Sequence, residues 1–77
     1  MNNVPFIQKD GRKLSIQAYS ILGEEHELQV LRSSAGYYIG TLTEDGFPNS
    51  RDSNYYPTAE AAQADLDNGT FTPRLNP

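Results

Sequence analysis

The residues of this chain that could do chemistry are one histidine and the carboxylates around it. His26 lies between Glu25 and Glu27, it is the only histidine of the 77 residues, and the chain has no cysteine. A lone imidazole needs carboxylate co-ligands to hold a metal ion, and a thiolate site is impossible. A serine–histidine pair would need a nucleophile elbow such as G-x-S-x-G, which the sequence lacks. We therefore expect no catalytic residue, no metal site and no cofactor.

Carboxylates could in principle supply a general acid and a general base. The candidates are Glu24, Glu25, Glu27, Asp45 and Asp52. Such catalysis requires a concave site in which desolvation shifts one pKa, and a small sheet with one helix rarely encloses such a site. A phosphate-binding loop is not expected either, because Gly36 and Gly40 lack the required spacing and lysine. The sequence therefore predicts a protein that is not an enzyme.

Charge is distributed unevenly along the chain. Residues 1–20 have a net charge of +2, residues 21–69 have a net charge of −7 from nine acids and two arginines, and the whole chain has a net charge of −4. Nucleic acid is disfavoured as a partner, because phosphate binding depends on Lys and Arg side chains that release counterions. A basic protein surface would be attracted to the acidic part, although ordinary solubility would also explain the bias.

The elements that must position these groups form one α+β domain over residues 1–77. Period-two alternation and turn signals predict strands over 4–9, 14–22, 28–33 and 37–43. After the turn Glu44-Asp45-Gly46, a polar strand over 47–56 is anchored by Phe47 and made peripheral by Pro48. The short connections predict an antiparallel meander of four to five strands within residues 4–56.

A helix is predicted over residues 58–68, followed by a tail over 70–77 that can pack back through Phe71 or Leu75. Thr58 is the expected N-cap, and Asn68-Gly69 is the expected stop. The helical stripe of Ala59, Ala62 and Leu66 is small. We expect it to pack on one face of the sheet, because an isolated helix of about eleven residues is marginal in water.

Two features indicate a binding surface. Tyr37-Tyr38 and Tyr55-Tyr56 are adjacent pairs, so at least one ring of each pair is expected to face away from the helix, where tyrosines often anchor interfaces. The alternative is that the N-terminal segment or the tail covers them. Asp65 and Asp67 occupy the last helical turn, where the helix dipole disfavours acids, which indicates either function or tolerated noise. The predicted protein-binding residues are Tyr38, Tyr56, Glu44, Asp45, Asp52, Glu60, Asp65 and Asp67.

The run from Gly36 to Leu66, "GYYIGTLTEDG" followed by "YYPTAEAAQADL", resembles the arm-type DNA-binding domains of tyrosine recombinases. Those domains are antiparallel sheets followed by a helix whose start often reads aromatic-x-Thr-x-x-Glu-Ala, which matches here with a shift of one position. The resemblance implies DNA contact through the sheet face, where this hairpin offers only one basic residue, Arg51. In size, acidity and lack of a catalytic set, the chain also resembles small phage and plasmid proteins that blunt host defence, including anti-CRISPR proteins.

We therefore expect a non-enzymatic module that docks on a basic, nucleic-acid-handling protein and inhibits it. One alternative is a DNA-binding accessory module with phosphate contacts from Lys9, Arg12, Lys13 and Arg51. Another is a structural homodimer that pairs through a sheet edge. Residues 1–8 do not resemble a signal peptide, and no apolar run approaches the roughly 20 residues of a membrane span. We expect a cytoplasmic protein with no membrane partner.

Overall fold

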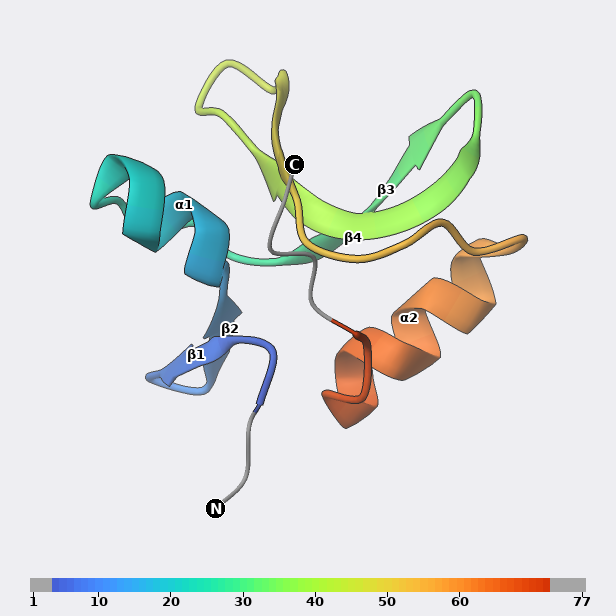
Figure 1. The fold of residues 1–77 in the computed structure, drawn as a ribbon, viewed down its shortest axis with the longest axis horizontal. Helices are drawn as coiled ribbons and strands as arrows, with labels where there is room; N and C mark the ends of the chain where they lie inside the picture. Colours follow the sequence, from blue (N-terminus) through green and yellow to red (C-terminus); the bar gives the residue numbers. More distant parts are fainter. Residues whose placement is uncertain (1–3, 73–77) are drawn as a thin grey trace.

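The computed structural model describes residues 4–72, and these form an α+β fold with two antiparallel sheets and two helices (Figure 1). Strands β1 (Ile7–Lys9) and β2 (Arg12–Leu14) form the smaller sheet. Strands β3 (Gln29–Ser33), β4 (Gly36–Leu42) and β5 (Pro48–Arg51) form the larger sheet in chain order. Helix α1 (Ile16–Leu22) follows β2, and helix α2 (Ala59–Asn68) follows β5. The predicted α+β class is confirmed.

The prediction of a single meander is wrong, because residues 16–22 form helix α1 instead of the second half of a strand over 14–22. Ser15 is the N-cap of α1 and its side chain accepts a hydrogen bond from the Ala18 backbone N–H at 3.0 Å. Gly23 ends the helix in the left-handed conformation at φ 68°. These two caps favour a helix over residues 16–22, although the short alternation of apolar and polar residues there is typical of a strand. An isolated bridge between Leu14 and Glu27, and a hydrogen bond from the Leu28 N–H to the Lys13 carbonyl at 2.8 Å, join β2 to the segment that leads into β3.

Strand β5 is shorter than the predicted strand over residues 47–56, because the chain leaves the sheet after Arg51. The Ile39 backbone N–H on β4 is bound by a side chain instead of a strand carbonyl, since it donates to the Ser53 hydroxyl at 2.9 Å. The chain returns at Tyr56, which forms an isolated antiparallel bridge with Tyr37. The segment between Arg51 and Tyr56 is therefore an excursion from the regular strand, held to β4 by a backbone bond from the Asp52 N–H to the Ile39 carbonyl at 2.8 Å and by the Ser53 side chain.

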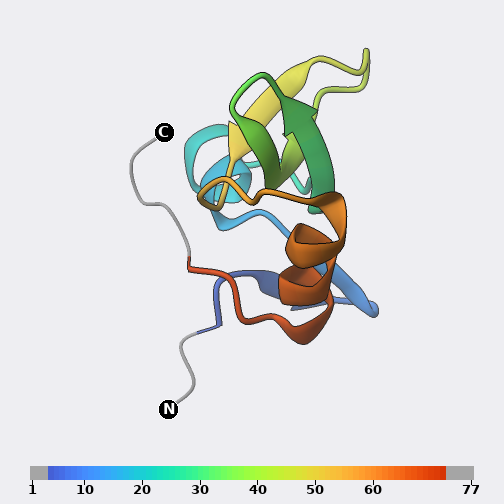
Figure 2. The same ribbon diagram turned by 90° about the vertical axis from the view of Figure 1, so that its right-hand side faces the viewer.

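Helix α2 covers one face of the larger sheet through contacts with β3 and β4 (Figures 1 and 2). Thr58 caps it by accepting from the Ala61 backbone N–H at 3.1 Å, and Gly69 ends it at φ 65°. The predicted helix and its stripe are confirmed, because Ala62 and Leu66 are buried in the core. The other members of the core cluster are Phe6, Leu28, Ile39 and Phe71. Leu75 and the rest of the predicted tail beyond Thr72 lie outside the described residues.

Within residues 4–72, neither helix has the length and apolar character needed to cross a membrane.

Candidate functional site

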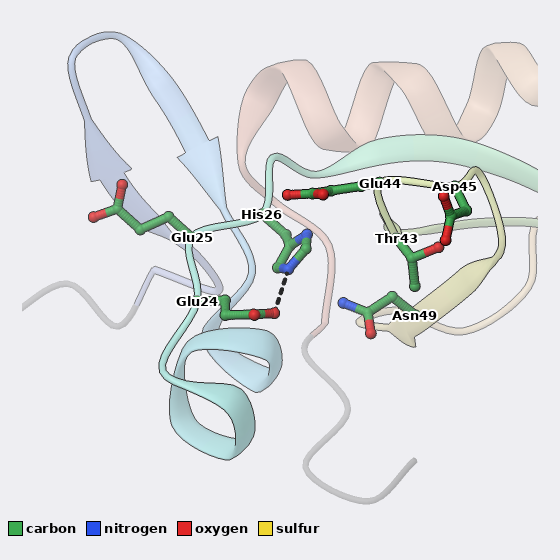
Figure 3. A pocket seen from close by; sticks show the side chains of 7 residues that line it. All are labelled: Glu24, Glu25, His26, Thr43, Glu44, Asp45 and Asn49. Carbon is green, nitrogen blue, oxygen red and sulfur yellow. Dashed lines mark hydrogen bonds and ion pairs between the residues drawn. The ribbon is translucent and has the colours of Figure 1, made fainter.

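An open, acidic groove lies between the loop that follows α1 and the β4–β5 hairpin (Figure 3). Its volume is about 630 Å³. The lining residues are Glu24, Glu25, His26, Thr43, Glu44, Asp45 and Asn49. We call this feature the acidic groove. It is lined largely by carboxylates and amide or hydroxyl groups, which suits basic or polar side chains better than an apolar ligand.

The first wall of the acidic groove is fixed by the end of α1. Gly23 turns the chain out of the helix, and the backbone carbonyl of His26 accepts a hydrogen bond from the Ser15 N–H at 2.9 Å. His26 Nε2 lies 3.0 Å from Oε1 of Glu24, so the imidazole and this carboxylate hold each other at the groove (Figure 3). The loop is therefore tied both to the helix and to the end of β2.

Glu25 lies at the rim of the acidic groove and points away from its centre, towards the β1–β2 hairpin (Figure 3). It forms an ion pair of 2.5 Å with the Lys9 ammonium group. This hydrogen bond from Lys9 lowers the pKa of the Glu25 carboxyl group. Lys9 thus offsets the charge of Glu25, and most of the groove's negative charge comes from the other acids.

The second wall is a tight hairpin whose turn residues Glu44 and Asp45 carry carboxylates. The Thr43 N–H donates to the Phe47 carbonyl at 2.7 Å, the Gly46 N–H donates to the Thr43 carbonyl at 2.9 Å, and Gly46 has φ 86°. This is the usual geometry of a three-residue hairpin loop, in which glycine takes the left-handed position. The predicted turn at residues 44–46 is confirmed, and it holds the two carboxylates at one end of the groove.

The acidic groove has more negative charge than its neighbours neutralise. Among the described residues, the ion pairs are Lys9–Glu25 and His26–Glu24, so no Lys or Arg side chain pairs with Glu44 or Asp45. Carboxylates that share a groove repel one another and attract an incoming cation. No group of three His, Cys, Asp or Glu side chains within residues 4–72 has a geometry that could hold a metal ion. The arrangement is suited to receiving lysine or arginine side chains.

The structure places five of the predicted acids in two separate regions. Glu44 and Asp45 line the acidic groove, whereas Glu60, Asp65 and Asp67 lie on α2, at a distance from the β4–β5 hairpin (Figure 1). The predicted acids do not form one surface.

Asp65 has structural partners that explain an acid in the last helical turn. Its carboxylate accepts hydrogen bonds from the Tyr56 hydroxyl at 2.8 Å and from the Thr70 hydroxyl at 2.9 Å. Burial of Tyr56 and its bond to this carboxylate raise the pKa of the Tyr56 phenol to about 12. Asp67 accepts from the Gln63 side chain at 2.8 Å. Asp65 thus joins α2 to the segments on either side of it, and Tyr56 is half-buried as part of that junction.

The expected exposure of Tyr38 is wrong, because this side chain is only 7% exposed. Its ring packs edge-to-face on Tyr55, with 5.8 Å between the centroids. Tyr55 is the more exposed ring at 41%, and the Arg51 guanidinium group lies 4.4 Å from its centroid. Because the excursion after Arg51 folds Tyr55 over the sheet, Tyr38 cannot anchor a partner from the surface.

Asp52 was expected to steer a partner from the surface, and this expectation is also wrong because the residue is 2% exposed. Its two carboxylate oxygens accept hydrogen bonds from the hydroxyls of Ser15 and Ser50, each at 2.7 Å. Burial raises the pKa of Asp52, against the opposing effect of these hydrogen bonds. Asp52 therefore ties the end of β5 to the N-terminus of α1.

Sequence reasoning also missed residues that reach the surface. Phe47, expected to anchor its strand, is 66% exposed. Its position directly after the turn glycine Gly46 is the sequence feature that could have indicated this exposure. Glu24 and His26 lie on the loop after α1, and Asn49 lies on β5. They line one groove only because α1 returns that loop to the β4–β5 hairpin, and no local sequence pattern predicts this approach.

The basic residues proposed as phosphate contacts are divided between two places. Lys9, Arg12 and Lys13 belong to the β1–β2 hairpin or its turn, and Arg51 ends β5. Lys9 binds Glu25, the Lys13 ammonium lies 5.6 Å from the Phe6 ring centroid, and Arg51 lies over Tyr55. Three of these four cations thus already contact a carboxylate or a ring, so the arrangement does not favour a phosphate-binding surface.

Comparison of the chain with protein-family models, with curated proteins and with solved structures finds no significant match.

Proposed function

We propose that this protein is a non-enzymatic protein-binding module whose acidic groove receives basic side chains of another protein. The observation that carries this proposal is the convergence of Glu24, Glu44 and Asp45 on one open groove (Figure 3). These carboxylates come from two loops that are separated in the chain by β3 and β4. Neither Glu44 nor Asp45 is paired with a Lys or Arg of residues 4–72. A Lys or Arg side chain of the partner would supply the positive charge that these two carboxylates lack within residues 4–72.

The energetics of such a groove set what it can achieve. An exposed ion pair contributes about 0–1 kcal/mol, so three carboxylates give modest affinity by themselves. Their larger effect is on the rate of association and on the choice of partner, because like-charged surfaces are repelled. Binding through the groove is therefore salt-sensitive.

The partner class that fits the groove is a protein with an exposed basic surface, such as one that handles nucleic acid. Lys and Arg side chains that contact phosphates are then also the ligands of the groove carboxylates. A partner whose Lys and Arg side chains are bound in the acidic groove cannot use them to bind phosphates. The module therefore inhibits its partner by competing with nucleic acid. The resemblance in size and acidity to anti-defence proteins of phages and plasmids points to the same class of partner, and to the cytoplasm as the place of action.

The test compares two variants with the same change in net charge. Glu44→Gln/Asp45→Asn neutralises the hairpin wall of the groove, and Glu60→Gln/Asp67→Asn neutralises two exposed acids of α2. Each immobilised protein is incubated with lysate at about 50 and about 500 mM salt, and retained proteins are identified by mass spectrometry.

The proposal expects nucleic-acid-binding proteins that are retained at low salt by the wild type and the α2 variant and lost by the groove variant. A purified partner should then lose its nucleic acid in a gel-shift assay as the wild-type protein is added. Equal retention by the two variants, or retention that does not depend on salt, contradicts the proposal. A direct gel shift of nucleic acid by this protein alone would favour the DNA-binding alternative.

A further inference from the structure

Phe47, directly after the β4–β5 turn, is 66% exposed, a higher fraction than that of the exposed Val4, Tyr19 and Tyr55. Pro48, the next residue, is exposed as well. Scattered exposed apolar residues are normal on small proteins, but a phenylalanine exposed to this extent beside a tight turn contributes little to the core. The core cluster does not include it.

The backbone of Phe47 is held firmly although its ring is exposed. Its N–H donates to the Thr43 hydroxyl at 3.1 Å, and its carbonyl accepts from the Thr43 N–H at 2.7 Å. The ring is therefore presented from a fixed hairpin, so little backbone entropy is lost when it is bound. Rigid aromatic side chains of this kind are frequent among the residues that dominate interfaces.

The charges around Phe47 define what can cover it. Glu44 and Asp45 lie in the same turn, and Glu24 faces that hairpin across the acidic groove (Figure 3). A second copy of this chain would bring the same acids against them, and like charges at an interface are repulsive. A partner that covers the ring must combine an apolar pocket with basic residues at its rim.

We propose that Phe47 is the apolar anchor of the interface, inserted in a pocket that basic residues of the partner protein surround. This inference rests on the proposed function. It specifies in addition that the partner's binding surface contains an apolar pocket as well as basic residues. The groove carboxylates select and orient a basic partner, and the Phe47 ring supplies contact area that salt does not screen.

The experiment uses two synthetic octapeptides of equal charge, one alternating lysine with leucine and one alternating lysine with serine. Each is titrated into the ¹⁵N-labelled 77-residue protein, and the dissociation constant is obtained from amide chemical shifts. Phe47→Ser is compared with Val4→Ser as the matched control, because Val4 is also exposed, at 50%, and is not among the residues that line the acidic groove. The spectra also verify that each variant is folded.

The wild type and the Val4 variant should bind the lysine–leucine peptide about tenfold more tightly than the lysine–serine peptide. Phe47→Ser should bind the two peptides equally. Equal binding of the two peptides by the wild type overturns the anchor and leaves the acidic groove in place. A leucine preference that persists in Phe47→Ser also overturns the anchor. If neither peptide binds the wild type, the proposed function itself fails and the anchor fails with it.

Discussion

Replacement of Asp52 by alanine tests the link between α1 and β5. The variant removes the carboxylate that accepts from the hydroxyls of Ser15 and Ser50 at 2.7 Å each. Ser15 is fully buried, and in the variant its hydroxyl still accepts from the Ala18 N–H at 3.0 Å but loses its carboxylate acceptor, so that only the Ser50 hydroxyl at 3.3 Å is left to receive its proton. The link between the helix and the strand is then broken at its centre.

The size of the effect follows from two opposing quantities. Hydrogen bonds to a charged acceptor contribute about 1.5–3 kcal/mol each, which gives a gross loss of about 3–6 kcal/mol. Removing a buried carboxylate also removes its desolvation penalty, which is several kcal/mol for a poorly compensated ion. We expect a net loss of about 2–3 kcal/mol near neutral pH, or roughly 10–20 °C in the unfolding midpoint of a domain of this size.

The loss should depend on pH in a defined direction. Burial raises the pKa of Asp52 in the folded protein, so the folded state holds this proton more tightly than the unfolded state. The protonated Asp52 contributes stability that is complete below the unfolded pKa of about 3.8 and is lost as pH rises through the folded pKa. The difference in stability between the wild type and Asp52→Ala is therefore largest in acid and shrinks as pH rises.

The assay is urea unfolding of both proteins from about pH 3 to pH 8, followed by circular dichroism. Taking the difference between the proteins cancels groups that both retain, such as Glu25, whose lowered pKa has the opposite effect of losing stability in acid. A difference that stays constant, or that grows with pH, would refute the assignment of the raised pKa. A difference below about 0.5 kcal/mol would refute the structural role of the link.

Three further substitutions test the packing around the sheet. Leu66→Ala should cost about 2–5 kcal/mol in denaturant unfolding, because it empties the core beneath α2; an unchanged midpoint would contradict the placement of the helix. Gly40→Ala should destabilise by about 2–3 kcal/mol, because the added Cβ overlaps the Ser50 carbonyl oxygen, and a neutral effect would contradict the close approach of β4 and β5. Tyr56→Phe should cost about 1 kcal/mol by removing the hydroxyl bond to Asp65. Since the phenol pKa is raised to about 12 from 10.0, the wild type should also lose stability relative to this variant as pH rises from 10 to 12, and a parallel pH response would show that the bond is absent.

The sequence predicted those elements whose signals are local and agree with each other. Helix α2 carries both caps, Thr58 and Gly69, and a buried stripe, and it was placed within one residue at its start. The turn at residues 44–46 needed a glycine in the left-handed conformation, and Gly46 supplies it. Helix α1 is not evident from the alternation of Leu14, Ile16 and Ala18, which is typical of a strand. Its signals are the caps, because Ser15 and Gly23 bond the free backbone groups at its two ends.

The site was predicted only where it coincides with a local turn. Glu44 and Asp45 line the acidic groove, but their partners across it depend on how α1 returns the chain to the hairpin. Tyr38 and Asp52 were misplaced for a related reason, since the excursion after β5 covers one with Tyr55 and brings the other to Ser15. Strand alternation gives the face on which a residue lies, and it does not say what later folds over that face.

The most direct test of the acidic groove is zero-length carbodiimide cross-linking of this protein to its captured basic partner, followed by peptide mass spectrometry. This reagent joins carboxylates to lysine amines that are already in contact, so it reports which acids face the partner. We predict cross-links from Glu24, Glu44 or Asp45, and their loss in about 500 mM salt. Cross-links confined to Glu60 and Asp67 on α2 would show that the partner binds elsewhere and would contradict the proposed role of the groove.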